Sequence, residues 1–274
     1  MKLSIIIVNL NTKKLTVECI ESIYRQNLKF PFEVFVTDNG SDDGSVEALK
    51  NIQKQRRNFT AIFNDSNTGY GKANNQGLKL AKGKYKMLLN NDTVIHKNAL
   101  ESLIEFAERT PDAGVIGSKL LNIDGSLQSS CYHFPTIKNA IMEYWLGKKG
   151  NFEKFAPKGK KPVTVDAVVG AAFLLTPKAQ ERVGNLDEKY FAYFEDIDYC
   201  RQTWKQGLKV YYLPESVITH YHGATFKKLA DQKDRWKKLI PSSKIYHGLI
   251  KHYVIHVILW TGQKWQKILS LLKG

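Results

Sequence analysis

Short apolar runs recur along the first half of the chain, and carboxylate or amide side chains follow them. The run at residues 3–8 is followed by Asn11, and the run at residues 87–89 is followed by Asp92. Apolar runs of this length, bounded by turn-forming residues, predict strands that are buried on both faces of a parallel sheet. Ligands of such open sheets bind beyond the carboxyl ends of the strands. The sequence therefore predicts an α/β fold with its ligand site at that edge.

Segments with helical spacing of apolar residues lie between these runs. Leu15, Cys19 and Ile23, for example, share one helical face between the first two runs. Strands that alternate with helices predict right-handed βαβ units and a mostly parallel sheet. We expect strands at residues 3–8, 33–37, 59–63, 87–89, 114–121, 163–175 and 208–213, a helix at 97–109, and an irregular, mobile excursion at 124–162.

The glycine motifs of common nucleotide-binding proteins do not follow the first predicted strand. The chain contains neither G-x-G-x-x-G after that strand nor G-x-x-x-x-G-K-[ST], which disfavours a dinucleotide dehydrogenase and a P-loop NTPase. Asn11, Asp38, Asn67 and Asp92 stand there instead, and such side chains can bind a base or ribose and hold a hard cation. For Asp92 the alternative is a surface turn that caps the helix expected at 97–109.

A second acidic centre lies at Glu195 and Asp196. Ile197, Cys200 and Trp204 recur at helical spacing, which places both carboxylates in the first turn of a helix. The helix dipole stabilises carboxylates there, so a purely structural role is one interpretation. The aromatic residues just before them favour the other interpretation, because apolar surroundings raise a carboxyl pKa towards the range of a general base.

Two histidines, His220 and His222, follow the last strong strand pattern on one face of an extended segment. A single histidine in such a place usually has a structural role. A pair beside Gly223, in a chain that also offers Asp92, favours one of them as a metal ligand.

Charge and cysteine content indicate the compartment and the class of partner. The formal net charge is +15, which suggests an anionic partner such as a phosphorylated substrate, an acidic membrane surface or nucleic acid. Surface lysines that merely face solvent would account for part of this charge. Three widely spaced cysteines form neither a disulfide framework nor a zinc pattern, so we expect a reducing, cytoplasmic compartment. The apolar run at the N-terminus is too short for a spanning helix and is interpreted as a strand.

The composition changes at about residue 226, where lysines and aromatic residues begin to alternate with aliphatic ones. We therefore divide the chain into a catalytic domain at 1–225 and a basic helical tail at 226–274. Charges interrupt every apolar run of the tail before it reaches spanning length. The pattern is typical of amphipathic helices on an anionic membrane surface, here the inner face of the cell membrane. Helices packed on the domain edge would give the same pattern.

The polar motifs also occur in a characteristic order. They are Asn11, then Asp38-Asn39-Gly40-Ser41-Asp42-Asp43-Gly44-Ser45, Asn67-Thr68-Gly69-Tyr70-Gly71 with Asn74, Asn90-Asn91-Asp92, the segment 191–201, and His220 with Gly223 and Thr225. Any one of these motifs is weak, but the ordered set resembles the glycosyltransferase family 2 enzymes with the GT-A fold, especially the rhamnosyltransferase-like branch. The resemblance extends over residues 3–225.

This resemblance implies an αβα sandwich that moves a sugar, with inversion, from a nucleotide-diphosphate sugar to a saccharide or lipid-linked saccharide in bacterial surface polysaccharide synthesis. It implies that Asp92 and His220 hold Mn²⁺ or Mg²⁺, and that Asp196, with Glu195 beside it, takes the proton from the acceptor hydroxyl. The positions implied for binding the nucleotide-sugar are Asn11, Asp38, Asn67, Gly69, Asn74, Asn90 and Asn91, with Asp38 on the nucleobase.

The sequence departs from the family pattern at two positions, which bear on metal binding and on the choice of nucleobase. Asn90 replaces the first acid of the family's D-x-D motif, which removes one anionic metal ligand. Leu10 stands where many relatives carry an aromatic residue against the base, so the nucleobase stays open, as do the sugar and the acceptor. The alternatives are a nucleotidyltransferase, which would need a basic, Gly-rich loop after the first strand, and a non-catalytic nucleic-acid-binding protein, which the acidic strand ends disfavour.

Overall fold

The first half of the chain alternates strands with helices, as the sequence predicts. The computed structural model describes residues 1–221 and 232–272. Its first elements are β1 (Leu3–Asn9), α1 (Lys13–Tyr24), β2 (Phe32–Asp38), α2 (Ser45–Gln55), β3 (Phe59–Phe63), α3 (Tyr70–Leu80), β4 (Tyr85–Asn90), β5 (Thr93–Ile95) and α4 (Ala99–Arg109).

The second half carries shorter strands and the helical tail. Its elements are β6 (Ala113–Leu121), β7 (Cys131–Tyr132), α5 (Ile137–Tyr144), β8 (Val163–Thr164), β9 (Ala167–Val168), β10 (Ala172–Leu175), α6 (Pro177–Arg182), α7 (Glu195–Lys205), β11 (Lys209–His220), α9 (Gln232–His247) and α10 (Leu249–Leu272). The strand expected at 163–175 is therefore three short strands. The excursion at 124–162 is not irregular throughout, because it contains β7 and α5.

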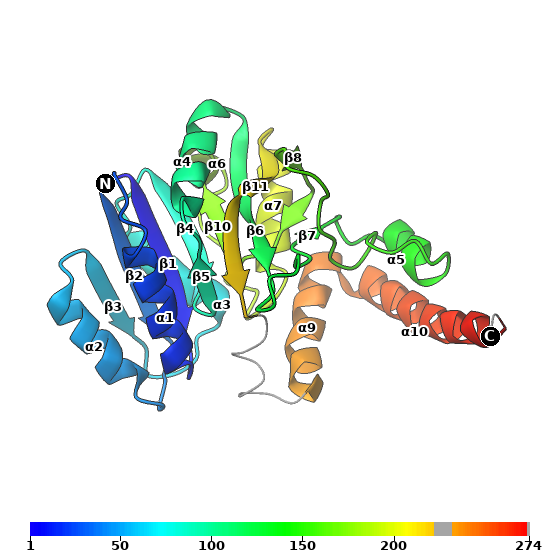
Figure 1. The fold of residues 1–274 in the computed structure, drawn as a ribbon. Helices are drawn as coiled ribbons and strands as arrows, with labels where there is room; N and C mark the ends of the chain where they lie inside the picture. The colour runs from blue at the N-terminus through cyan, green and yellow to red at the C-terminus, as the bar shows by residue number, and fades with distance from the viewer. Residues whose placement is uncertain (222–231, 273–274) are drawn as a thin grey trace.

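A single nine-stranded sheet forms the centre of the molecule, with helices on both of its faces (Figure 1). Strands β3, β2, β1 and β4 are parallel neighbours in that order. Next to β4 lies β10, which runs antiparallel to both β4 and β6, so β6 regains the direction of β4. Strand β11 then pairs in parallel with β6 and antiparallel with the edge strand β5. The sheet is mostly parallel, as expected, with antiparallel insertions at β10 and β5.

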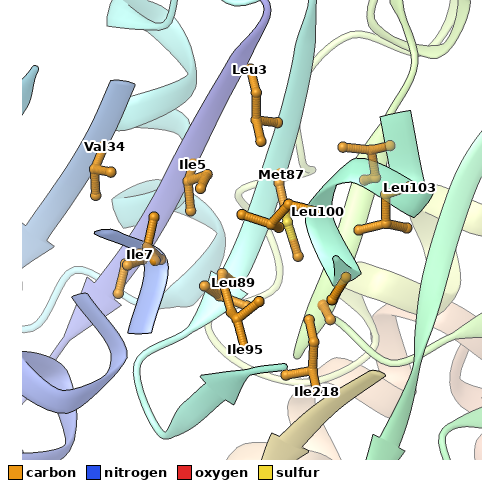
Figure 2. Close-up of a cluster of buried hydrophobic side chains, with 14 of the residues drawn as sticks. Leu3, Ile5, Ile7, Val34, Met87, Leu89, Ile95, Leu100, Leu103 and Ile218 are labelled. Atoms are coloured by element: carbon orange, nitrogen blue, oxygen red, sulfur yellow. The ribbon is translucent and has the colours of Figure 1, made fainter. Parts of the chain in front are cut away.

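Both faces of the sheet are covered, which explains why the predicted strands are almost wholly apolar. Ile5 and Ile7 pack in the core on one face of the sheet (Figure 2), whereas Ile6 packs in the core on the other. Met87 and Leu89 likewise face one core and Leu88 the other. Because successive side chains of a strand point to opposite faces, a strand covered on both sides needs no polar positions. The resulting rigid sheet carries the polar strand ends at one edge.

The C-terminal helices extend away from this sheet, and α10 lies alongside α5 (Figure 1). Gly262 allows the close approach, since a Cβ atom there would lie 2.7 Å from the Cβ atom of Tyr144. The rings of Trp145 and Trp265 stack at a centroid distance of 6.3 Å. No helix within residues 1–221 and 232–272 is long and apolar enough to cross a membrane. The predicted domain boundary at 225/226, together with His222, Gly223 and Thr225, lies outside the described residues.

Candidate active site

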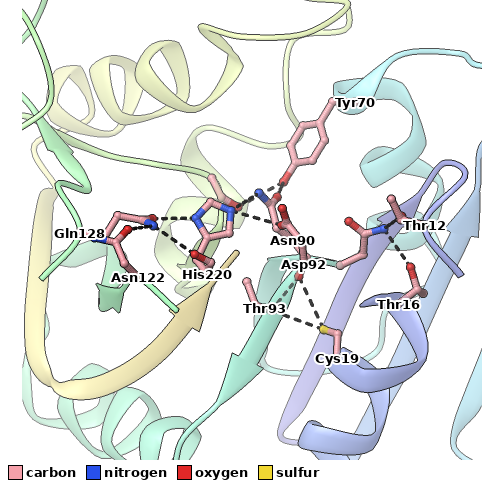
Figure 3. Close-up of polar contacts among 12 residues, drawn as sticks. Thr12, Thr16, Cys19, Tyr70, Asn90, Asp92, Thr93, Asn122, Gln128 and His220 are labelled. Atoms are coloured by element: carbon pink, nitrogen blue, oxygen red, sulfur yellow. Dashed lines mark hydrogen bonds and ion pairs between the residues drawn. The ribbon is translucent and has the colours of Figure 1, made fainter. Parts of the chain in front are cut away.

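Asp92 lies in the tight turn between β4 and β5, at the end of a central strand. It is 4% exposed, and β5 separates it from α4, whose N-cap is Asn98. The interpretation of Asp92 as a surface cap of that helix is therefore wrong. Pairing of β5 with β11 sets Thr93 opposite His220. As a result, Asp92 Oδ1 lies 3.2 Å from His220 Nε2 (Figure 3).

The orientation of His220 is fixed by Gln128, a residue that sequence reasoning missed. The Gln128 side-chain amide donates to the carbonyl of His220 at 3.1 Å and to Asn122 Oδ1 at 2.8 Å, which identifies its other atom as the acceptor Oε1. That oxygen lies 2.7 Å from His220 Nδ1, so Nδ1 donates to it (Figure 3). A neutral imidazole that donates from Nδ1 keeps a lone pair on Nε2, the atom that faces Asp92.

Asp92 and His220 fit a divalent cation with a sparse set of protein ligands. A buried carboxylate oxygen and an imidazole nitrogen suit Mn²⁺ and, less well, Mg²⁺. Within the described residues no group of three or more His, Cys, Asp or Glu side chains could hold a metal. The nearby amide of Asn90 is a weak ligand at best, because its Nδ2 lies 3.3 Å from His220 Nε2. Such a site needs further oxygen ligands from a substrate.

Asn91, in contrast to its two neighbours, faces the loop that follows β1. Its buried side-chain amide donates to Asn9 Oδ1 at 3.1 Å, to Thr12 Oγ1 at 2.5 Å and to Thr16 Oγ1 at 2.9 Å. These bonds tie the β4–β5 turn to the start of α1. Asn91 thus holds the turn in place, and the structure does not bring its amide to the Asp92–His220 pair.

The residues expected to bind the nucleotide line the loops that follow β1, β2 and β3. Asp38 is fully buried and accepts from Asn9 Nδ2 at 2.6 Å and from the Ser41 backbone N–H at 2.9 Å. Asn11 adopts a positive φ of 52°, and its Oδ1 accepts from the Asp42 backbone N–H at 2.8 Å. These bonds shape the two loops into one surface at the carboxyl edge of the sheet.

Asn67 and Gly69 lie just before α3, and Asn74 lies in its second turn. The exposed Asn67 accepts from the Gly69 backbone N–H at 3.0 Å. Gly69 has a φ of 90°, and a Cβ atom there would lie 2.8 Å from the carbonyl oxygen of Phe191, so only glycine fits. Asn74 donates to the carbonyl of Tyr70, whereas its Oδ1 is buried without a hydrogen-bond partner. An orphaned buried acceptor of this kind is suited to a ligand donor.

Glu195 and Asp196 form the first turn of α7, as predicted from helical spacing. The chain enters this turn through Tyr193 and Phe194, whose φ angles of 68° and 69° are uncommon for bulky residues. Asp196 Oδ2 accepts from the Gly170 backbone N–H at 2.9 Å. Non-glycine residues held at positive φ cluster at functional sites, because the surrounding structure must hold them there.

Both carboxyl groups have raised pKa values. Burial raises the pKa of Glu195 to about 8, with a further contribution from the charge of Asp196. The Oε2 atom of Glu195 is buried without a hydrogen-bond partner. Burial also raises the pKa of Asp196, while the backbone N–H groups of Gly170 and Ile197 oppose that shift. Asp196 is thus the better stabilised carboxylate of the two, and Glu195 holds its proton more readily.

Tyr70 connects the metal pair with the acidic pair, a role that the sequence motif containing it did not indicate. Its hydroxyl lies 3.1 Å from Asn90 Oδ1 and 3.2 Å from the carbonyl oxygen of Gly170 (Figure 3). Gly170 in turn holds Asp196 through its N–H. The two acidic centres, distant in sequence, are therefore linked through Tyr70 and Gly170. A tyrosine beside a loop motif carries no sequence signal for such a bridge.

Comparison with known proteins identifies the family of the chain. Residues 4–168 match the family model described as glycosyl transferase family 2, and residues 87–272 match that of glycosyl transferase family group 2. The N-acetylglucosaminyl-diphospho-decaprenol L-rhamnosyltransferase of Mycobacterium tuberculosis is 26% identical over 242 residues, which cover 75% of this chain and 77% of the relative. The poly(ribitol-phosphate) beta-glucosyltransferase of Bacillus spizizenii is 32% identical over 127 residues, 46% of this chain and 20% of that protein.

Solved structures share the fold at lower identity. The mannosyltransferase PcManGT from Pyrobaculum calidifontis, in complex with GDP-Man and Mn²⁺, superposes with a TM-score of 0.62 at 16% identity, over 98% of this chain and 75% of that one. Residues 1–349 of S. aureus TarS give a TM-score of 0.57 at 18% identity, over 94% and 69%. The GT-A expectation is confirmed, and neither a nucleotidyltransferase nor a nucleic-acid-binding protein is supported. By its sequence match over more than half its length, the chain belongs to glycosyl transferase family 2.

Proposed function

We propose that this glycosyltransferase moves a sugar from a nucleoside-diphosphate sugar to a hydroxyl of a lipid-linked saccharide, with inversion at the anomeric carbon. The observation that carries the proposal is the short chain of contacts, through Tyr70 and Gly170, that places the Asp92–His220 pair on one side and Asp196 on the other. One side suits an anionic leaving group and the other suits a base. A displacement in line needs these two groups on opposite sides of the reacting carbon.

Asp196 is the proposed base. Its carboxylate removes the proton from the acceptor hydroxyl while the oxygen forms a bond to the anomeric carbon and the bond to the phosphate oxygen breaks. Burial raises the pKa of this carboxyl, which makes it a stronger base than an exposed aspartate. The N–H of Gly170 keeps one oxygen oriented, so the carboxylate remains ionised and aimed. Glu195, beside it and more readily protonated, adds to the positioning of α7.

Asp92 and His220 are the residues that would hold Mn²⁺ or Mg²⁺. A divalent cation there would neutralise charge that develops on the leaving diphosphate. The imidazole favours Mn²⁺, because nitrogen ligands suit transition metals better than Mg²⁺. Gln128 orients the imidazole so that its Nε2 faces Asp92. The nucleoside part of the donor would lie against Asn11, Asp38, Asn67, Gly69 and Asn74, with Asn90 and Asn91 at the turn.

The membrane surface is the proposed location of the acceptor. Helix α10 exposes a row of apolar side chains, and α5 adds further ones beside it. Exposed lysines accompany this row on both helices and on the segment after α5. The apolar residues are Ile141, Trp145, Leu146, Leu249, Ile250, Tyr253, Val254, Val257, Trp260, Trp265, Ile268 and Leu271. An apolar face flanked by lysines fits an anionic bilayer surface. Relatives named for a diphospho-decaprenol acceptor and a poly(ribitol-phosphate) acceptor support a surface-polymer substrate.

Donor hydrolysis tests the proposed activity without knowledge of the acceptor. A panel of UDP-, GDP- and dTDP-sugars is incubated with the protein and Mn²⁺, and release of nucleoside diphosphate is measured. We expect one donor to be hydrolysed in a metal-dependent way, and expect Asp92→Ala to abolish that hydrolysis. Equal release by the wild-type and Asp92→Ala proteins for every donor would contradict the proposal. The selected donor is then used with N-acetylglucosamine carried on diphospho-farnesol or on an octyl chain, to detect transfer.

A further inference from the structure

A separate cavity lies between α5, α7 and the junction of α9 with α10. Its volume is about 400 Å³, and its walls include Phe134, Lys138, Arg201, His247, Lys251 and Ile255. This volume lies within the range of small-molecule sites, about 300–1,000 Å³. The residues of the metal pair and of the acidic pair are not among its walls.

The walls of this cavity are basic. Lys138, Arg201 and Lys251 contribute cationic groups, and no Asp or Glu is among the lining residues. Lys138 and Lys251 are exposed, and no ion pair joins either of them to a carboxylate of the described residues. Asp198, which is not among the lining residues, pairs with Arg201, so the net positive charge of the wall comes from the two lysines. Ammonium groups beside a guanidinium attract an anion with several acceptor oxygens, such as a diphosphate.

Arg201 is held rigidly and still has an unused donor. Its guanidinium bonds to Asp198 and lies 4.0 Å from the centroid of the Tyr246 ring. Its Nε–H group is buried without a hydrogen-bond partner. A fixed guanidinium with a spare donor is a good anchor for phosphate oxygens, because little side-chain freedom is lost on binding. His247 adds an imidazole, whose pKa burial lowers to about 4, so it is a neutral hydrogen-bonding group at physiological pH.

Helix α7 contributes both to the cavity wall and to the proposed base. Arg201 lies five residues after Asp196 on α7, about 7.5 Å along the helix axis at 1.5 Å per residue. Phe194, which directly precedes the acidic pair, packs its ring against Tyr246 at 5.2 Å and against His247 at 5.7 Å. An anion in the cavity would therefore be held by the same helix that presents Asp196.

Apolar surface continues from the cavity along α10. Ile255 forms part of the wall, and the same helix exposes Ile250, Val254 and Val257. A basic cavity next to an exposed apolar helix face matches a ligand in which an anionic group is joined to a lipid chain. Neither a free nucleotide nor a neutral saccharide would use both features.

We propose that this cavity binds the diphosphate through which the acceptor saccharide is attached to its prenyl-type lipid. The inference deepens the proposed function, on which it rests, by assigning the acceptor's anchoring group to α5, α7 and α10. Lys138, Lys251 and Arg201 bind the phosphate oxygens, the lipid chain follows α10 towards the membrane, and the sugar extends towards Asp196.

A binding measurement tests the cavity without any turnover. Farnesyl diphosphate is titrated by calorimetry into the wild-type protein, the double variant Lys138→Ala/Lys251→Ala, and a matched control on α2, Lys50→Ala/Lys54→Ala. All four lysines are exposed, so we expect every variant to fold. We expect at least a tenfold weaker affinity in the cavity variant only, since each tenfold change corresponds to about 1.4 kcal/mol. Equal weakening in the control, or none in the cavity variant, would overturn the assignment.

Two competitors identify the chemistry of the ligand. Farnesol, which lacks the phosphates, should bind at least tenfold more weakly, whereas inorganic diphosphate should compete with farnesyl diphosphate. Saturating UDP, GDP or dTDP with Mn²⁺ should leave farnesyl diphosphate binding unchanged, because the donor occupies the other site. Displacement by nucleotide would place the ligand in the donor site and overturn the proposal. Equal binding of farnesol would do the same.

Kinetics separates failure of this inference from failure of the proposed function. With N-acetylglucosamine on diphospho-farnesol as acceptor, the cavity variant should show a KM raised at least tenfold with kcat unchanged. With the octyl-linked acceptor, its kinetics should equal those of wild type. Equal losses with both acceptors would overturn the cavity assignment. If the wild-type protein hydrolyses no donor and glycosylates neither acceptor, the proposed function fails, and the binding data then stand alone.

Discussion

Replacement of Asp196 by asparagine removes the proposed base while leaving its shape. The carboxylate now accepts two backbone N–H groups, from Gly170 at 2.9 Å and from Ile197 at 2.8 Å. Asparagine offers only one acceptor oxygen, so one buried N–H would face an NH₂ group. An unsatisfied buried donor costs about 1–3 kcal/mol, which is smaller than a typical unfolding free energy of about 5–15 kcal/mol. We expect Asp196→Asn to remain folded.

The effect on turnover should be much larger than the effect on stability. General-base catalysis contributes about 10²–10⁴-fold, so we expect kcat to fall by at least about a hundredfold. Affinity for the nucleoside diphosphate should stay within about twofold of wild type, since Asp92 and His220 are unchanged. The assay is a single-turnover measurement with saturating donor and acceptor, combined with calorimetry of nucleotide binding and a thermal melt.

A matched variant controls for the loss of one carboxylate. Asp187→Asn makes the same chemical change at a partly exposed aspartate whose ion-pair partner is Lys189. We expect its turnover to equal that of wild type. If Asp196→Asn also retains turnover near the wild-type value with the true acceptor, the assignment of the base is refuted. A hundredfold loss in both variants would likewise remove any special role for Asp196.

Three further predictions concern stability and location. Burial raises the pKa of Glu195 from 4.5 to about 8, so its protonated carboxyl stabilises the folded state below pH 4.5 and this contribution is lost towards pH 8. The melting temperature of Glu195→Gln relative to wild type should therefore rise over that pH window, and a constant difference would contradict this. The free energy of unfolding in urea should fall by about 1–3 kcal/mol more in Gly69→Ala than in Gly207→Ala, because only the new Cβ atom at Gly69 meets a backbone oxygen, at 2.8 Å. Equal losses in the two variants would contradict this prediction. Ile250→Glu/Val257→Glu should weaken salt-sensitive sedimentation with anionic vesicles, and unchanged sedimentation would favour helices packed only on the domain.

The sequence was most informative about strands that are buried on both faces. Residues 3–8 and 87–89 were predicted as strands, because short apolar runs bounded by turn-forming residues are typical of strands buried on both faces. The polar ends of those strands then located the candidate site, since parallel strands bring their carboxyl ends to one edge. Helical spacing also placed Glu195 and Asp196 in the first turn of α7, where the structure has them.

Features that depend on tertiary contact could not be predicted in this way. The antiparallel strand β10 lies between β4 and β6, and no local pattern encodes which strand enters that gap. Helix α5 is short, and it packs mainly against α10, more than a hundred residues later in the chain. Gln128 and Tyr70 act through partners that are distant in sequence, at His220 and Gly170. Only the folded chain reveals such pairs.

The metal-dependent binding of a nucleoside diphosphate tests the central claim most directly. Asp92 and His220 meet at 3.2 Å but form too sparse a set to hold a divalent cation strongly alone. Metal and diphosphate should therefore bind with positive and reciprocal coupling, about 1–3 kcal/mol in typical cases. Calorimetry of UDP, GDP and dTDP, with and without Mn²⁺, is performed on the wild-type, Asp92→Ala and His220→Ala proteins. The account predicts that Mn²⁺ tightens one nucleotide at least fivefold in wild type and fails to do so in both variants. Nucleotide binding that is indifferent to Mn²⁺ in the wild-type protein, or coupling that survives both substitutions, would contradict it.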